Sequence, residues 1–309
     1  MKKIAVSIGD LNGIGLEIAL RAHKKIKKIC EPLYMVDKKM IQKGANLLGL
    51  TLPDDFKTFK ISKPFRIVPG KVSKKSGLYS FHSFIKGVEL VKNREVDAIV
   101  TLPINKEAWS KAGANYKGHT EVLSDIFKKD AIMMIGCEKL FACLYTQHIP
   151  LKDVHKKIKT KKLYKFFIDL QNSINAPKIA VLGLNPHAGD NGVIGNEEKK
   201  IKKAIKEVNS YYGKEIFYGP LVPDTAFSPK NIKNMRYFVA LYHDQGLIPV
   251  KTLYFDESIN VSLNLPIIRT SVDHGTAFDI AYKKDHTPSL KSYINAVKEA
   301  VRLEWVQKV

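Results

Sequence analysis

The stretch that decides the fold is Tyr237-Phe238-Val239-Ala240-Leu241-Tyr242, which leads directly into His243-Asp244-Gln245-Gly246. An apolar run that ends in polar residues is typical of a buried strand reaching the ligand-binding edge of an open α/β sheet. The polar part continues through Lys251 and Asn260 to Arg269-Thr270-Ser271-Val272-Asp273-His274-Gly275-Thr276. A solvated loop could be equally polar, and the spacing alone leaves both interpretations open.

Apolar runs alternate with helical patterns along the whole chain, which favours an α/β architecture. We expect strands at residues 4–8, 33–36, 96–100, 140–145, 179–184 and 237–242. Helices are expected from about residue 16, around 81–91, from 118–121 with Thr120 as a cap, from Glu197-Glu198 and over 292–306. Residues 51–78 are rich in proline and are expected to be irregular. A chain of 309 residues is long enough for about two domains.

The composition is that of an ordinary soluble protein, with 45% hydrophobic and 26% charged residues. No apolar run approaches the ~18 residues that span a bilayer. The apolar run near the start, residues 4–8, is short and is followed by Asp10, so this run predicts a first strand and not a signal peptide. Cys30, Cys137 and Cys143 form no close-spaced metal or redox motif and are expected to be buried free thiols. We therefore expect a cytoplasmic protein without a membrane partner.

The net charge of +21 raises the question of nucleic-acid binding, and clusters such as Lys156-Lys157-Ile158-Lys159-Thr160-Lys161-Lys162 suggest it. Lysine dominates, however, and the lysines are spread over every expected helix. No zinc-finger, helix-turn-helix or aromatic RNA-binding signature accompanies them. A solvated lysine-rich surface without a nucleic-acid partner is the favoured interpretation, and the surplus charge could attract an anionic small molecule.

Three histidines, His148, His187 and His243, each follow an apolar run that predicts a strand. In a parallel sheet such positions gather at one edge. Three imidazoles meeting there would form an open metal site with room for substrate oxygens. A single histidine at a strand end is more often a hydrogen-bonded structural residue, and no short ligand motif decides between the two readings.

Basic and hydrogen-bonding residues near the same segments suggest an anionic ligand. Arg269 follows the apolar Leu265-Pro266-Ile267-Ile268, which favours a buried, partnered guanidinium suited to phosphate or carboxylate. Lys251 lies outside the lysine runs, and His119-Thr120 at an expected helix start offers further donors. Surface charge is the alternative for both basic residues.

The N-terminal turn, Gly9-Asp10-Leu11-Asn12-Gly13-Ile14-Gly15, lies between a strand and a helix, as a phosphate loop would. Its glycines are not spaced as GxGxxG, and no Walker lysine follows. Asp37 ends the second expected strand, where a Rossmann enzyme places its ribose-binding acid. A tight turn with a capping acid explains these residues equally well.

Together these segments resemble the 4-hydroxythreonine-4-phosphate dehydrogenases of pyridoxal phosphate biosynthesis. The matching stretches occur in family order and span almost the whole chain: Gly9-Asp10 with Gly13-Ile14-Gly15-Leu16-Glu17, Gly118-His119-Thr120-Glu121, Asn185-Pro186-His187-Ala188-Gly189, Tyr242-His243-Asp244-Gln245-Gly246 and Arg269-Thr270-Ser271-Val272-Asp273-His274-Gly275-Thr276-Ala277. Two departures are Leu11-Asn12 in place of Pro-Ala and Tyr282-Lys283 in place of a glycine after Ala281.

The resemblance implies a two-domain isopropylmalate dehydrogenase-like fold, a three-layer α/β/α arrangement that is not a Rossmann domain. We expect one domain of residues 1–105 with 250–309, carrying most of the NAD site. Residues 106–249 would form the other domain, with the metal ligands and the interface of a homodimer. The active sites would lie at the subunit interface.

The resemblance also assigns roles to residues. A divalent metal, zinc, magnesium or cobalt, would be held by His148, His187 and His243, drawn from both subunits. The phosphorylated substrate would contact His119, Thr120, Lys251, Asn260 and Arg269. The NAD contacts would lie in residues 274–281, at His274, Gly275, Thr276, Ala277 and Asp279. Catalytic roles would fall to Asp244, beside a proposed ligand, and to Lys251.

The implied reaction is the metal-dependent oxidation and decarboxylation of 4-phosphooxy-L-threonine by NAD⁺, with NADP⁺ as a possible substitute. It would give 3-amino-2-oxopropyl phosphate, CO₂ and NADH for pyridoxine synthesis. The same motifs would serve a paralogous dehydrogenase acting on 4-phosphoerythronate or threonate 4-phosphate. A metal-dependent phosphohydrolase would use similar residues but would need no NAD⁺.

Overall fold

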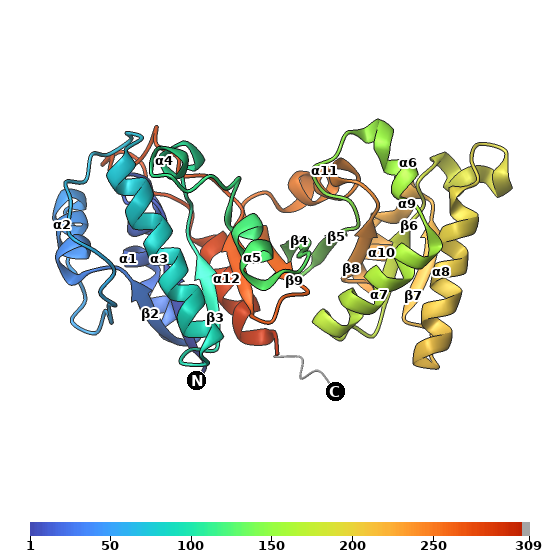
Figure 1. The fold of residues 1–309 in the computed structure, drawn as a ribbon, viewed down its shortest axis with the longest axis horizontal. Helices are drawn as coiled ribbons and strands as arrows, with labels where there is room; N and C mark the ends of the chain where they lie inside the picture. Colours follow the sequence, from blue (N-terminus) through green and yellow to red (C-terminus); the bar gives the residue numbers. More distant parts are fainter. Residues whose placement is uncertain (305–309) are drawn as a thin grey trace. The chain divides into compact units, whose positions relative to one another are not determined.

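The computed structural model describes residues 1–304, which divide into two compact units. Unit 1 comprises Met1–Ala131 with residues 259–304, and unit 2 comprises Ile132–Ser258 (Figure 1). The units begin and end at different residues from the expected domains, 1–105 with 250–309 and 106–249, and the roles assigned to those domains stay a prediction. No helix in this part of the chain is both long and apolar enough to cross a membrane.

Unit 1 contains five strands whose residues are almost all buried. Their order is β2 (Glu31–Met35), β1 (Lys3–Ser7), β3 (Ala98–Thr101), β10 (Arg269–Val272) and β9 (Ile259–Leu263). The first four are mutually parallel, and β9 runs antiparallel to β10. Continuous burial matches the apolar runs because helices cover both faces of a parallel sheet. The sequence predicted β1, β2 and β3 but neither β10 nor the antiparallel β9.

Helices cover the two faces of this sheet, as two contacts show. On one face, the Ser83 hydroxyl of α3 donates to the carbonyl of Met35 on β2. On the other face, the Thr270 hydroxyl of β10 donates to the carbonyl of Ala296 on α12. Side chains alternate along a strand, so Arg269, next to Thr270, points to the α3 side. The helices of unit 1 are α1 (Gly15–Ile26), α2 (Lys38–Leu48), α3 (Lys74–Lys92), α4 (Lys106–Lys111), α5 (His119–Phe127) and α12 (Lys291–Arg302).

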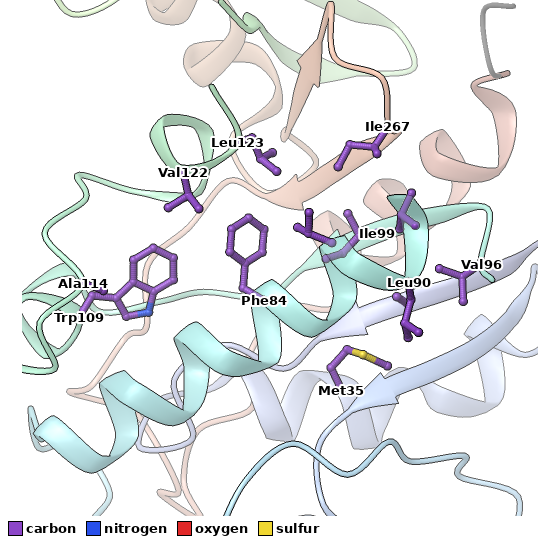
Figure 2. Packing of buried hydrophobic residues seen from close by; sticks show 13 residues of the cluster. Met35, Phe84, Leu90, Val96, Ile99, Trp109, Ala114, Val122, Leu123 and Ile267 are labelled. Carbon is purple, nitrogen blue, oxygen red and sulfur yellow. The ribbon is translucent and has the colours of Figure 1, made fainter. Parts of the chain in front are cut away.

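A hydrophobic cluster on the α3 side holds the start of α5 in place (Figure 2). Phe84 of α3 packs there with Ile99 of β3, and Val122 and Leu123 bring in α5. Trp109 of α4 is fully buried, and its indole N–H donates to the Ser80 hydroxyl at 2.8 Å. A buried indole with a satisfied N–H adds large apolar area without an unpaired donor. The first residue of α5 is therefore fixed above the sheet.

Unit 2 contains an antiparallel hairpin followed by parallel strands. The order is β4 (Ile132–Cys137), β5 (Leu140–Leu144), β8 (Tyr237–Ala240), β6 (Ile179–Leu182) and β7 (Phe217–Leu221). Only β4 and β5 are antiparallel, and β5, β8, β6 and β7 run parallel. The helical segments are η1 (Leu151–Asp153), α6 (Val154–Lys157), α7 (Thr160–Ile174), η2 (Pro186–Gly192), α8 (Glu197–Tyr212), α9 (Pro223–Ala226), α10 (Pro229–Asn234) and α11 (His243–Tyr254).

Gly246 lets α11 lie close to the strands beneath it. A Cβ at this position would come within 2.9 Å of the Cβ atoms of Ala142 on β5 and Ala240 on β8. Real Cβ atoms do not approach so closely, so glycine is needed for this packing. The close approach places the first turn of α11, with His243, directly after β8.

The α/β prediction is confirmed, with corrections to local detail. Thr120 is not a cap, because α5 begins at His119 and its N-cap is Gly118, which offers no side chain. The polar residues after Tyr242 form a helix and not a loop, since α11 begins at His243. The closing helix spans Lys291–Arg302, and residues 305–306 of the expected helix lie outside the described residues. The three cysteines are buried and free, as predicted.

Candidate active site

In unit 2, the three histidines follow three strands that are neighbours in the sheet. His148 follows β5, His243 follows β8 and His187 follows β6, and β8 lies between the other two. All three strands are parallel, so their carboxyl ends lie at one edge. The sequence-based expectation that these strand ends gather is confirmed.

Hydrogen bonds from buried side chains tie the three strand ends together. The Thr146 hydroxyl donates to the carbonyl of Leu241 at 2.6 Å, which joins the ends of β5 and β8. The Gln245 side chain accepts from the Leu241 N–H at 2.7 Å and donates to the carbonyl of Gly183 at 2.8 Å, joining β8 to β6. Sequence reasoning missed both roles, since an interior hydrogen bond to a distant backbone leaves no local pattern.

His148 and His243 lie close together, with ring centroids 5.4 Å apart. His243 Nδ1 is 2.7 Å from the Asp244 carboxylate. An ionised carboxylate only accepts, so this bond places the proton on Nδ1 and leaves Nε2 of His243 for a ligand. Among residues 1–304, no group of three or more His, Cys, Asp or Glu side chains is arranged to hold a metal. The structure thus brings two of the three predicted ligands together within one chain.

His187 lies on an unusual left-handed turn. The φ angles of His187, Ala188, Gly189, Asp190 and Asn191 are 53°, 51°, 80°, 42° and 54°. Only glycine adopts this conformation freely, and other residues lose roughly 1–2 kcal/mol each. The surrounding structure must hold such a turn in place, and strain of this kind concentrates at functional sites.

In unit 1, Arg269 is a buried cation without an acidic partner. It is 3% exposed, and its guanidinium donates to the hydroxyls of Ser262 at 3.0 Å and Thr101 at 2.7 Å. Its Nε has no hydrogen-bond partner among the described residues. Burial lowers the pKa of Arg269 to about 9 because removing a cation from water is costly. A buried charge normally has an anionic partner, so this site is prepared for an anion.

We call Arg269, His119 and Asn260 together the Arg269 cluster. The His119 ring meets Phe84 edge-on at 4.5 Å, and its Nε2 has no partner in the part of the chain described. Burial and the nearby charge of Arg269 hold the pKa of His119 well below its usual value, so the ring is neutral at neutral pH. Asn260 lies on β9 across from Ser271, and its Oδ1 likewise lacks a partner among residues 1–304. The charge of Arg269 acts on His119, and Asn260 lies on β9 two residues from Ser262, which accepts from Arg269.

The two remaining predicted substrate residues occupy different units. Thr120 is half-buried in the first turn of α5 in unit 1, next to His119. Lys251 lies on α11 in unit 2, where its ammonium group is 3.3 Å from the Ser258 hydroxyl and 5.2 Å from the Phe255 ring centroid.

The predicted cofactor residues form a loop after β10 in unit 1. The carbonyl of Thr276 accepts from the N–H of Ile14, so this loop rests on the N-terminal turn. Thr276 is buried, whereas Gly275 and Asp279 are exposed. Apart from Gly275 itself and its two chain neighbours, no heavy atom of residues 1–304 lies within 4 Å of the place where a Cβ of Gly275 would be. Open backbone at a glycine and an exposed carboxylate fit a nucleotide, whose ribose hydroxyls donate to acids.

The residues also fit a divalent metal. Imidazole nitrogens are ligands that zinc and cobalt accept readily, and His243 has the carboxylate partner on its second nitrogen that metal-bound histidines usually show.

Comparisons with known proteins show which proteins the chain is similar to. The family model of the pyridoxal phosphate biosynthetic protein PdxA matches residues 28–300. A 4-hydroxythreonine-4-phosphate dehydrogenase of Sulfurimonas denitrificans is 56% identical over 301 residues, covering 97% of each chain. The crystal structure of a 4-hydroxythreonine-4-phosphate dehydrogenase from Burkholderia phymatum has a TM-score of 0.82 at 31% identity, covering 98% of each chain. A terephthalate dihydrodiol dehydrogenase from Burkholderia xenovorans, at 24% identity and a TM-score of 0.70, shares the fold.

The family model covers most of the chain, and the Sulfurimonas relative aligns over nearly its full length. The chain therefore belongs to the PdxA family of pyridoxal phosphate biosynthetic proteins.

Proposed function

We propose that the chain is an NAD-dependent oxidoreductase that converts 4-phosphooxy-L-threonine and NAD⁺ to 3-amino-2-oxopropyl phosphate, CO₂ and NADH. The observation that carries the proposal is the Arg269 cluster. Among residues 1–304 it holds a buried cation without an acidic partner and two further polar atoms, His119 Nε2 and Asn260 Oδ1, without hydrogen-bond partners. A phosphorylated substrate supplies the missing anion. The relatives are named 4-hydroxythreonine-4-phosphate dehydrogenases, and this name suggests the class of substrate. We also propose that the protein is cytoplasmic.

The chain's residues would divide the work of binding. Arg269 would hold the phosphate through Nε. The neutral ring of His119, in the tautomer with its proton on Nε2, would donate a hydrogen bond to the same phosphate. Asn260 and Thr120 would contact the substrate beside them, and Lys251 would bind the substrate and move a proton. Fixing the substrate at its phosphate orients the hydroxyl-bearing carbon for hydride transfer.

His148, His187 and His243 would hold the metal, and Asp244 would orient His243 through Nδ1 or take part in proton transfer. A divalent cation, when bound, supplies Lewis acidity that lowers the pKa of the substrate hydroxyl and stabilises negative charge during loss of CO₂. NAD⁺ would lie against His274, Gly275, Thr276, Ala277 and Asp279 and accept the hydride, with NADP⁺ as the alternative.

A homodimer with shared active sites is also part of the proposal. Unit 2 exposes large apolar side chains on the segments that carry the proposed ligands: Leu151 after His148, Val193 after His187, and Ile248 and Phe255 on and beyond α11. Val193 is 83% exposed and Phe255 is 70% exposed. Exposed apolar side chains on these segments would favour burial against another chain. Metal ligands would then come from two copies.

The activity prediction is direct. Purified protein with 4-phosphooxy-L-threonine should reduce NAD⁺, measured by absorbance of the reduced nicotinamide, and a chelator should abolish the reaction until metal is restored. Faster turnover with 4-phosphoerythronate or threonate 4-phosphate would reassign the substrate. Release of inorganic phosphate without NAD⁺ would replace the proposal with a phosphohydrolase.

Arg269→Met tests the anion site. The neutral side chain removes an uncompensated buried charge, so we expect a Tm equal to or above that of the unsubstituted chain. Binding of the phosphorylated substrate should weaken by about 2–5 kcal/mol because the buried charge pair is lost. Inorganic phosphate should raise the Tm of the unsubstituted chain and not that of the variant.

Arg302→Met is the matched control, since the exposed Arg302 pairs with the buried Glu299 of α12 and lies outside the Arg269 cluster. It should keep the response to phosphate. An Arg269→Met variant that is still stabilised by phosphate would show that Arg269 does not hold the anion.

Sharing of ligands between copies can be tested by mixing two inactive variants, His187→Ala and His243→Ala. If each site takes these histidines from different chains, half of the sites in a mixed dimer are intact, and random exchange restores about a quarter of the activity. Sites built within one chain would stay inactive in every combination. Light scattering on the same samples reports the oligomeric state.

A further inference from the structure

We propose that Glu198 is a positioning residue that fixes the left-handed turn of His187 in its ligand-binding conformation. Glu198 lies in the first turn of α8 and is 4% exposed. Its carboxylate is hydrogen-bonded to Leu184 and Asn185, and it would act on the site by fixing the segment that precedes His187. This inference rests on the proposed role of His187 as a metal ligand.

The carboxylate of Glu198 receives three hydrogen bonds from the segment just before the turn. One oxygen accepts from the N–H of Leu184 at 2.9 Å and from the N–H of Asn185 at 2.8 Å. The other oxygen accepts from the Asn185 side-chain amide at 2.9 Å. Bonds to an ionised acceptor are the stronger kind, and both backbone donors precede Pro186, where the turn begins.

The turn itself closes around the same carboxylate. A Cβ at Gly189 would lie 2.6 Å from the second oxygen of Glu198, so the glycine packs directly against the acid. The N–H of Ile194 donates to the carbonyl of Gly189 at 3.1 Å, which returns the chain toward α8. In the chain, His187 thus lies between Asn185, which donates to Glu198, and Gly189, which packs against it.

The local conformation gives Glu198 a task that a surface acid would not have. Four of the residues from His187 to Asn191 are not glycine but have positive φ, a state that they do not adopt without support. A buried carboxylate with three donors supplies that support. The neighbouring Glu197 adds one bond, accepting from the Asn185 amide at 2.9 Å, but it is less buried.

The test measures metal binding without substrate or cofactor. The full chain, freed of metal with a chelator, is titrated with Co²⁺ alone while its visible absorption bands are recorded. Glu198→Gln keeps the shape of the side chain but replaces one carboxylate oxygen with an NH₂ group, which would face the N–H donors of Leu184 and Asn185. We expect its affinity for Co²⁺ to fall roughly 10–100-fold, as for other residues that orient metal ligands, and its bands to shift. Hydrogen exchange at Leu184 and Asn185 should become faster.

Glu207→Gln is the matched control, an exposed glutamate on the same helix, and it should bind Co²⁺ unchanged. Asn185→Ala is a second variant that removes the amide donor from the partly exposed side, and it should weaken Co²⁺ binding less than Glu198→Gln. Turnover of Glu198→Gln should recover at saturating metal, since a positioning defect lowers affinity and leaves the reacting groups in place.

His187→Ala distinguishes a failure of the metal assignment from a failure of the role proposed for Glu198. If it binds Co²⁺ as the unsubstituted chain does, the metal assignment fails and this inference fails with it. If it loses Co²⁺ while folded Glu198→Gln keeps normal affinity and spectrum, Glu198 is not a positioning residue although the metal site stands. If Glu198→Gln does not fold, unchanged Co²⁺ binding by Asn185→Ala overturns the inference. A different substrate would leave all these results unchanged.

Discussion

The Arg269 guanidinium is the constraint on which the proposed chemistry depends. It lies in the sheet of unit 1, and within the described part of the chain its hydrogen-bond partners are the hydroxyls of Ser262 and Thr101. Two hydroxyl acceptors do not neutralise a cation, and the low pKa of Arg269 reflects the unfavourable free energy of that burial. A site with this imbalance is stabilised by an anionic ligand, because the ligand supplies the charge that the protein omits.

The packing beneath this cation explains how the imbalance is maintained. Phe84 and Trp109 lie against His119 and keep its ring in an apolar setting, where it stays neutral beside a positive charge. The cluster in Figure 2 therefore bears on the proposed function. It supports the position and the neutral state of His119, the proposed hydrogen-bond donor to the phosphate. The same contacts stabilise the core and position His119.

In unit 2 the order of the strands supplies a second constraint. Because β5, β8 and β6 are parallel neighbours, histidines far apart in the sequence follow adjacent strand ends. The bonds of Thr146 and Gln245 hold those ends at fixed spacing, and Glu198 shapes the turn after β6. A sheet edge becomes a candidate metal centre only when such side chains remove the freedom of its loops.

Apolar runs predicted the buried strands and placed the histidines after them, because continuous burial of a parallel strand is written in its own residues. Burial of Arg269 was predicted, but its pairing with two hydroxyls in place of an acid was not, since it depends on which residues the fold brings to β9 and β3. The sequence placed Glu198 at the start of a helix but did not predict its burial, which depends on the strained turn at His187 packing against it. The helix at His243 was missed because its polar first turn resembles a loop.

The most direct measurement is a crystal structure of the protein with a phosphorylated substrate and a divalent metal, in which anomalous scattering locates the metal. Our account predicts the phosphate within hydrogen-bond distance of Arg269 Nε and His119 Nε2, with the metal bound to His148, His187 and His243. A phosphate bound elsewhere while Arg269 keeps only Ser262 and Thr101 as partners would contradict it.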